Sequence, residues 1–152
     1  MTEFIARNPD YASAVRASFE GQTMMDTLGA RLLDVAPGTV TITSSIPPTT
    51  LQQQGIAHAG LAFSIGDNAA GYASLSLLPA GFEVVTSEMK IHLLAPGVGD
   101  QFVAIGRVLK PGRKLMIAES EVWAETGADR RLIAKLIGTL IPIQTKAEPP
   151  HD

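Results

Sequence analysis

Hydrophobic and polar residues alternate in the second half of the chain with the period of two that is typical of β-strands. The alternation is clearest in residues 114–125, where Glu119, Glu121 and Trp123 are interleaved with small or apolar residues. Pro-Gly pairs and a Gly-Ala-Asp segment mark turns between such stretches. One face of the resulting sheet should therefore be buried. Its strands are expected at residues 84–94, 101–110, 114–125 and 131–143.

The first half of the chain predicts a short helix and a β-hairpin. Apolar residues four positions apart, at Tyr11, Val15 and Phe19, indicate an amphipathic helix over residues 11–19. A Pro-Gly turn between an apolar stretch and a stretch rich in β-branched residues indicates the hairpin. The two hairpin strands and the loop after them are expected at residues 32–35, 40–46 and 47–57.

Residues 59–82 carry a single charge, Asp67, and are rich in Ala, Gly and Ser, which disfavours a strand. Pro79 is a helix stop, so we expect a helix over residues 59–78. Because this helix is small or apolar on every side, it must be enclosed, and only strands are available to enclose it. The predicted fold is α+β, with a long central helix wrapped by a curved antiparallel sheet of five or six strands.

A membrane crossing by this segment is disfavoured, because Asp67 and Asn68 would lie in the middle of the bilayer. The N-terminal residues include charges, such as Glu3 and Arg7, that the apolar core of a signal peptide lacks. We therefore expect a cytoplasmic protein without membrane contacts.

A length of 152 residues fits one domain, which we place at residues 1–145, followed by a disordered tail at 146–152. Charged residues make up 18% of the chain, below the roughly 25% of an average soluble domain, so partners should cover part of the surface. A net charge of −3 without a basic run argues against nucleic acid as a partner.

The composition excludes several kinds of chemistry. The sequence has no cysteine, which removes thiolate nucleophiles, disulfides and cysteine-ligated metals. His58, His92 and His151 lie in unrelated segments, so no metal site is expected. No phosphate-binding loop or dinucleotide fingerprint occurs. Catalysis would have to use oxygen or nitrogen groups.

Asp67 is the residue that packing does not explain, because burying an unpartnered carboxylate costs several kcal/mol. Either it reaches the surface or a hydrogen-bond partner, or it has a raised pKa and a catalytic role. A glycine-punctuated loop leads into the start of the same helix, whose free N–H groups could polarise a carbonyl oxygen. A capping role is the simpler interpretation of His58, as an ordinary loop amide is of Gln52.

Ala59 and Asp67 are eight residues apart, which corresponds to about 12 Å along a helix. Within one chain they cannot converge on one reacting atom. If they cooperate, the site must lie between two subunits related by a two-fold axis. Catalysis would then require at least a dimer.

Six residues in the loop before the predicted helix and in the helix itself have the spacing of a sequence motif: Gln52, Gly55, His58, Ala59, Gly60 and Asp67. The spacing resembles that of the hotdog-fold acyl-CoA thioesterases of the phenylacetate-degradation, or PaaI-like, type, and the resemblance covers residues 24–143. It implies a hotdog fold and hydrolysis of an acyl-CoA to a free acid and coenzyme A. Coenzyme A belongs to the substrate, and no metal or redox cofactor is implied. The resemblance also implies that the chain forms at least a homodimer, and that the complete assembly is a homotetramer.

By the same resemblance, the Ala59 N–H would polarise the thioester carbonyl, with His58 and Gly60 completing the motif. Gln52 would position the carbonyl or the attacking water. Ala59 departs from the family pattern, which has glycine there. Its N–H is retained, but its methyl group could narrow the pocket or alter the choice of substrate.

The resemblance makes the partner subunit's Asp67 the general base or the nucleophile, and the residues leave both modes open. A hydroxyl residue often follows on the next strand in this family, and Thr86 occupies that place. Strand surface is an equally good explanation of Thr86.

Four basic residues gather around one Pro-Gly turn: Arg107, Lys110, Arg113 and Lys114. They could contact the phosphates of coenzyme A. An ordinary solvated turn is the alternative.

Two other functions stay open. One is a non-catalytic acyl-CoA-binding or regulatory hotdog protein, which the departure at Ala59 allows and the retained Asp67 disfavours. The other is a dehydratase, which would usually place its acid next to the histidine rather than nine residues later. The acyl group, aliphatic or aryl, is not readable from the sequence.

Overall fold

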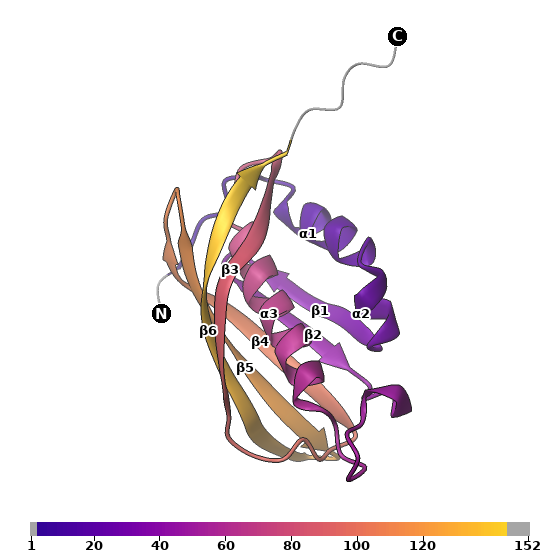
Figure 1. Cartoon of the computed structure of the whole chain (residues 1–152). Coiled ribbons are helices and arrows are strands. Elements are labelled where there is room, and N and C mark those ends of the chain that lie inside the picture. The colour runs from indigo at the N-terminus through magenta and orange to yellow at the C-terminus, as the bar shows by residue number, and fades with distance from the viewer. Residues whose placement is uncertain (1–2, 146–152) are drawn as a thin grey trace.

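A curved antiparallel sheet wraps around the long helix α3 (Ala59–Leu75) in the computed structural model, which describes residues 3–145 (Figure 1). The strands are β1 (Ala30–Ala36), β2 (Thr39–Ser44), β3 (Phe82–Leu93), β4 (Gln101–Pro111), β5 (Met116–Thr126) and β6 (Asp129–Gln144). Their order is β1-β2-β4-β5-β6-β3, so β1 and β3 form the two edges. The predicted α+β arrangement is confirmed, with six strands in the described part of the chain. The tail expected at 146–152 lies outside that part.

Three short elements accompany the sheet: α1 (Tyr11–Glu20), α2 (Thr23–Thr27) and the 3₁₀ helix η1 (Pro48–Thr50). The prediction of α1 is confirmed, whereas α2 and η1 are too short to show a helical period in the sequence. Strand β2 ends at Ser44 rather than at the expected residue 46. The reason is that Ile46 has a φ of 54°, a left-handed conformation that interrupts the strand.

Alternating residues of β5 form part of the core, as the pattern predicts. Met116, Ala118, Val122 and Ala124 are buried against the helix side of the sheet, and Ser120 is buried among them. The residues between them are partly exposed on the other side. The apolar residues around α3 form one continuous hydrophobic cluster.

Glycines allow the helix and the sheet to come into very close contact. At Gly106 on β4, an added Cβ would lie 2.1 Å from the backbone oxygen of Ala69 on α3. At Gly66 on α3, an added Cβ would lie 2.8 Å from the side chain of Leu136 on β6. Close packing of the helix on the sheet therefore requires glycine at both positions.

Helix α3 ends at Leu75, three residues earlier than expected. The hydroxyl of Ser76 donates to the carbonyl of Ala73 (2.7 Å) and accepts from the N–H of Gly38 in the β1–β2 turn (2.8 Å). After the helix, the N–H groups of Leu77 and Leu78 donate to the carbonyls three residues earlier and form two further turns. The helix is thus tied to the hairpin at its C-terminal end.

The sheet does not enclose α3 completely, contrary to the prediction. Helix α1 covers one flank, where Phe19 packs edge-on against Tyr72. A stripe between this flank and the edge strand β3 stays partly exposed: Phe63, Ser64, Asp67 and Asn68. Among residues 3–145, no helix combines the length and the apolar character needed to cross a membrane.

The substitution Gly106→Ala should lower the free energy of unfolding by about 1–3 kcal/mol, because the new methyl group meets backbone that cannot rotate away. Urea denaturation followed by circular dichroism measures this change. Gly21→Ala is the control, since an added Cβ there comes no closer than 3.4 Å to another atom. Equal stability of the Gly106 variant and the wild type would contradict the close packing of β4 on α3.

Candidate active site

The loop before α3 is held by its own backbone. The N–H of His58 donates to the carbonyl of Thr50 (2.9 Å), and the N–H of Gln52 donates to the carbonyl of Ile56 (2.8 Å). Gly55 turns the loop with a φ of 79°, a conformation that glycine adopts without strain. The loop therefore presents the first turn of α3 in a defined orientation.

His58 caps the helix, as the simpler interpretation of this residue predicted. Its Nδ1 accepts a hydrogen bond of 2.8 Å from the N–H of Gly60, so Nδ1 is unprotonated. A side chain at position 60 would collide with the imidazole, since a Cβ there would lie 2.9 Å from Nδ1. Gly60 thus serves the cap, and its N–H is occupied.

The N–H of Ala59 is left as the free donor at this helix end. Ala59 is the first residue of α3, where a backbone N–H has no partner within the helix. Within residues 3–145, no acceptor outside the helix bonds to it either. The residue is exposed, so this N–H can donate to a bound carbonyl oxygen at the positive end of the helix dipole.

A pocket of about 570 Å³ opens at the helix N-terminus. Gln52, His58 and Ala59 form its polar rim, and Phe102 and Ile133 belong to its apolar wall. The side-chain oxygen of Gln52 accepts from the N–H of Gln54 (2.5 Å), and its amide NH₂ group donates to the side-chain oxygen of Gln54 (3.5 Å), which leaves the second hydrogen of the NH₂ group as a free donor. The predicted residues Gln52, His58 and Ala59 are therefore brought together.

Asp67 lies in a different pocket, of about 400 Å³, between α3 and the edge strand β3. Its carboxylate accepts a hydrogen bond of 2.7 Å from the hydroxyl of Thr86. A β-bulge at Ser87 interrupts the register of β3 with β6 directly after Thr86. Burial raises the pKa of Asp67 above its ordinary value, and the hydrogen bond from Thr86 offsets part of that rise.

Four polar residues of the same pocket were not anticipated from the sequence. The Gln22 amide donates to the side-chain oxygen of Asn68 (2.9 Å) and to the Tyr72 hydroxyl, which lies 3.3 Å from that of Ser18. Gln22 precedes the unexpected helix α2. No local sequence signal marks the site role of these residues, because folding alone brings α1 and α2 against α3.

The two pockets have no lining residue in common within the chain. They lie at opposite ends of β3, which contributes residues 83–86 to one pocket and Leu93 with the following loop to the other. The helix alone separates Ala59 from Asp67 by about 12 Å. Each chain therefore holds two separate halves of the predicted site.

The basic turn lies away from the helix N-terminus. Lys110, Arg113 and Lys114 are exposed around the β4–β5 turn, at the end of the sheet opposite the start of α3 (Figure 1). Arg107 faces outward and forms an ion pair of 3.6 Å with Glu121. Their predicted contact with phosphates stays a prediction.

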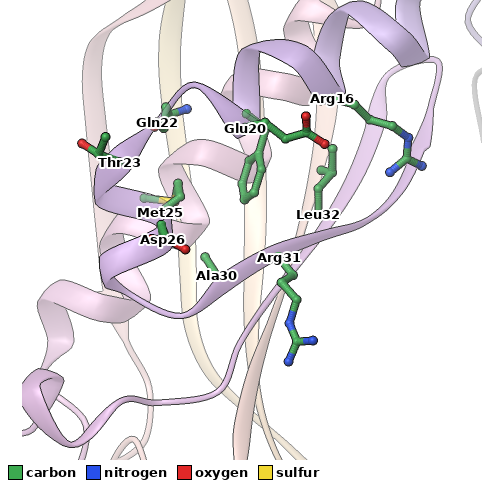
Figure 2. A pocket seen from close by; sticks show the side chains of 10 residues that line it. Arg16, Glu20, Gln22, Thr23, Met25, Asp26, Ala30, Arg31 and Leu32 are labelled. Atoms are coloured by element: carbon green, nitrogen blue, oxygen red, sulfur yellow. The ribbon is translucent and has the colours of Figure 1, made fainter.

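A third pocket, of about 480 Å³, lies between α1, α2 and β1 (Figure 2). Its walls carry opposite charges, with Arg16 and Glu20 from α1 and Arg31 from β1 among them. It contains no residue that the sequence assigned to a site. Within the described residues, no three His, Asp or Glu side chains gather as a metal ion would require.

Comparison with known proteins finds similar sequences and folds over most of the chain. The sequence model of the thioesterase superfamily matches residues 54–130. A thioesterase family protein from Silicibacter pomeroyi has a crystal structure that is 37% identical in sequence and superposes with a TM-score of 0.86. The match covers 88% of this chain and 98% of that chain.

Two further relatives are more distant. The E. coli PaaI protein, from the phenylacetic acid degradation operon, superposes with a TM-score of 0.81 over 92% of this chain and 98% of its own. At 23% identity, this similarity shows a shared fold. A curated relative from Saccharolobus solfataricus that carries an esterase name is 28% identical over 121 residues, which cover 80% of this chain and 84% of that protein.

Replacing Thr86 by valine should raise the pKa of Asp67 further, because the hydrogen bond that favours the ionised carboxylate is lost. A ¹³C NMR titration of the side-chain carboxyl groups measures the change. Ser87→Ala, at the neighbouring bulge, is the control and should leave this pKa where it is. An unchanged pKa in Thr86→Val would show that the hydrogen bond does not act on Asp67.

Proposed function

Because this chain belongs to the thioesterase superfamily, and has the hotdog fold of its PaaI-like members, we propose that it hydrolyses acyl-CoA thioesters to a free acid and coenzyme A. The observation that carries the proposal is the pair formed by the free N–H of Ala59 and the half-buried carboxylate of Asp67. The N–H of Ala59 can donate a hydrogen bond to the carbonyl oxygen of the thioester. The carboxylate of Asp67 can take a proton from an attacking water or can itself attack the carbonyl carbon. Thioester hydrolysis needs both.

The helix start binds and polarises the thioester. The carbonyl oxygen accepts from the N–H of Ala59, and the NH₂ group of Gln52 lies on the rim of the same pocket as a second donor. Negative charge that develops on this oxygen during attack is stabilised by the N–H groups and the helix dipole. Gly60 and His58 act indirectly, by holding the first turn of the helix.

The carboxylate of Asp67 drives the attack. As a general base it takes a proton from water while the water oxygen bonds to the carbonyl carbon. The C–S bond then breaks, and the thiolate of coenzyme A leaves and is protonated. As a nucleophile it would instead attack the carbonyl carbon and expel the coenzyme A thiolate, which forms a mixed anhydride that water cleaves. After a single turnover in H₂¹⁸O, label in the carboxylate of Asp67 would identify this second route, because the general-base route puts ¹⁸O only into the product acid.

A second subunit joins the two halves through the edge strand β3, whose free backbone groups can pair with another strand. If the β3 strands of two subunits pair antiparallel about a two-fold axis at Met89, Glu88 of each subunit lies opposite the partner's Lys90. Both side chains lie on the same face, since Glu88 pairs with Thr139 and Lys90 with Ile137 in alternate positions of β6. Two complementary charge pairs result.

The same register builds the complete site. Because of the β-bulge, Ser87 and Thr86 together occupy one position of this register, and Thr86 comes to lie opposite the partner's Ile91, at about 4.5–5.5 Å between Cα atoms. Leu93, two residues further along the same face, and Leu94 line the pocket at the helix N-terminus. The hydrogen-bonded pair Thr86 and Asp67 of one subunit therefore approaches the Ala59 pocket of the other, which gives two sites per dimer.

The β4–β5 turn with its basic residues comes close to this site together with Asp67 of the same subunit. Met116 pairs with Leu140, and Leu140 pairs with Thr86, so the β4–β5 turn lies two strand spacings, or roughly 10 Å, from Thr86. We assign phosphate contacts to Lys110, Arg113 and Lys114. Arg107 is engaged with Glu121 on the outer face of the sheet and is better explained by that ion pair.

The acyl group fits the apolar part of the pocket at the helix N-terminus. Ala62, Leu93 and Phe102 contribute to its wall, and about 570 Å³ accommodates an aliphatic or an aryl acyl group. Ala59 lines this pocket, and its methyl group leaves less room there than a glycine would.

Asp67→Asn should reduce thiol release from a panel of aliphatic and aryl acyl-CoAs by about 10²–10⁴-fold, because the amide cannot accept a proton or attack. In the wild type, kcat/KM should fall as the pH drops through the pKa of Asp67, which burial places above that of an ordinary aspartate. Asp34→Asn, at an exposed position of β1, is the matched control and should keep full activity.

An Asp67→Asn variant as active as wild type would contradict the catalytic role of Asp67. Binding of acyl-CoA by the wild type without thiol release would favour a non-catalytic acyl-CoA-binding protein. Hydration of an enoyl-CoA in the same assay would identify a dehydratase.

A further inference from the structure

The pocket between α1, α2 and β1 has an apolar floor. Phe19, Met25 and Ala30 are buried there, and Leu32 of β1 is half-buried at the same surface. Its volume of about 480 Å³ falls in the range of pockets that hold small organic molecules. The pocket can therefore take up an apolar body of that size.

Charges of both signs surround this apolar floor. Arg16 and Glu20 lie one helical turn apart on α1, and Figure 2 shows both side chains on the side of the helix that faces Leu32. Arg31 and Asp26 also line the pocket and add one charge of each sign. The four charges sum to zero. The pocket as a whole therefore favours neither a net anion nor a net cation.

Arg16 and Glu20 do not neutralise each other. The ion pairs within residues 3–145 join residues of β4, β5 and β6, and neither Arg16 nor Glu20 takes part in one. Residues four apart on a helix are neighbours, but the favourable order places the acidic residue first, and here it comes second. Both charges are thus available to a ligand.

An α-amino acid with an apolar side chain complements all of these features. It carries an ammonium and a carboxylate on one carbon, and the Cβ atoms of residues 16 and 20 are about 5–6 Å apart on a helix. Its carboxylate can pair with the guanidinium of Arg16 while its ammonium pairs with the carboxylate of Glu20. Its side chain then packs against Phe19 and Met25 on the apolar floor.

Gln22 connects this pocket to the pocket of Asp67. It lines both pockets, and its amide NH₂ group donates to Asn68 and to Tyr72 in the second. Phe19, on the floor of the first pocket, packs edge-on against the same Tyr72. A ligand in the first pocket therefore contacts side chains that bind the neighbours of the candidate catalytic carboxylate.

We propose that the pocket between α1, α2 and β1 is a regulatory site for a free α-amino acid with an apolar side chain. Strand β1 is the sheet edge opposite β3, so the site stays open when two chains pair through β3. Binding of the amino acid does not depend on the proposed function. Regulation rests on that function, because it is read in the hydrolysis of acyl-CoA.

Titration calorimetry on the full-length chain measures the binding. L-Leucine and L-phenylalanine should each bind at one site per chain. 4-Methylpentanoate lacks the ammonium of leucine and 3-methylbutylamine lacks its carboxylate, so each should bind about tenfold more weakly or worse. Glycine should also bind weakly, because it has no apolar body to bury.

Arg16→Gln and Glu20→Gln should each weaken the binding of leucine by about tenfold or more. Arg131→Gln and Asp34→Asn, at exposed positions outside the pocket, are the matched controls and should bind leucine as the wild type does. The site would be overturned if neither amino acid binds, if either truncated analogue binds as tightly as leucine, or if both α1 variants retain full affinity.

Saturating leucine should change the KM of thiol release by about fivefold or more in the wild type. In Arg16→Gln it should have no effect, and the KM of that variant without leucine should equal that of the wild type. A wild-type KM that bound leucine does not alter would overturn the regulatory role. Leucine binding by a chain that releases no thiol from any acyl-CoA would leave the binding site standing and refute the proposed function alone.

Discussion

The close packing of α3 on the sheet is the constraint on which the rest of the structure depends. Gly106 lets the strand touch the helix backbone, and Gly66 makes room for Leu136. The helix is therefore held straight, and bending cannot bring Ala59, at its start, and Asp67, at its middle, toward one substrate. Its free N–H group at Ala59 and its carboxylate at Asp67 stay in separate pockets, one at each end of the edge strand. If both groups act on one substrate, as we propose, a complete active site requires a second subunit.

Packing also explains how a helix of small residues can accommodate a carboxylate. Asp67 lies on the stripe that the sheet leaves uncovered, so it keeps contact with water on one side and with Thr86 on the other. This position is buried enough to raise its pKa and open enough for a substrate. These two properties are the reason that we assign the catalytic role to Asp67.

The sequence predicted the fold well because the relevant signals are local. Alternation in β5, the Pro-Gly turns and the long stretch of small residues each indicate an element without knowledge of its neighbours. The spacing from Gln52 to Asp67 indicated both halves of the site. The sequence could not show that Thr86 holds Asp67, nor that Gln22 and Tyr72 line the same pocket, because these contacts join segments about 20 to 50 residues apart. The left-handed conformation of Ile46 likewise has no turn sequence that would predict it.

The most direct test of a site shared between subunits is activity in mixed dimers. Ala59→Pro removes the free N–H at a helix position that tolerates proline, and His58 before it already has an extended ψ of 142°. Coexpressed with Asp67→Asn under two affinity tags, it should give mixed dimers that have one intact site and about half the wild-type activity per dimer. Two differently tagged Asp67→Asn chains are the control and should stay inactive. Mixed dimers as inactive as both parents would contradict a site built from two chains.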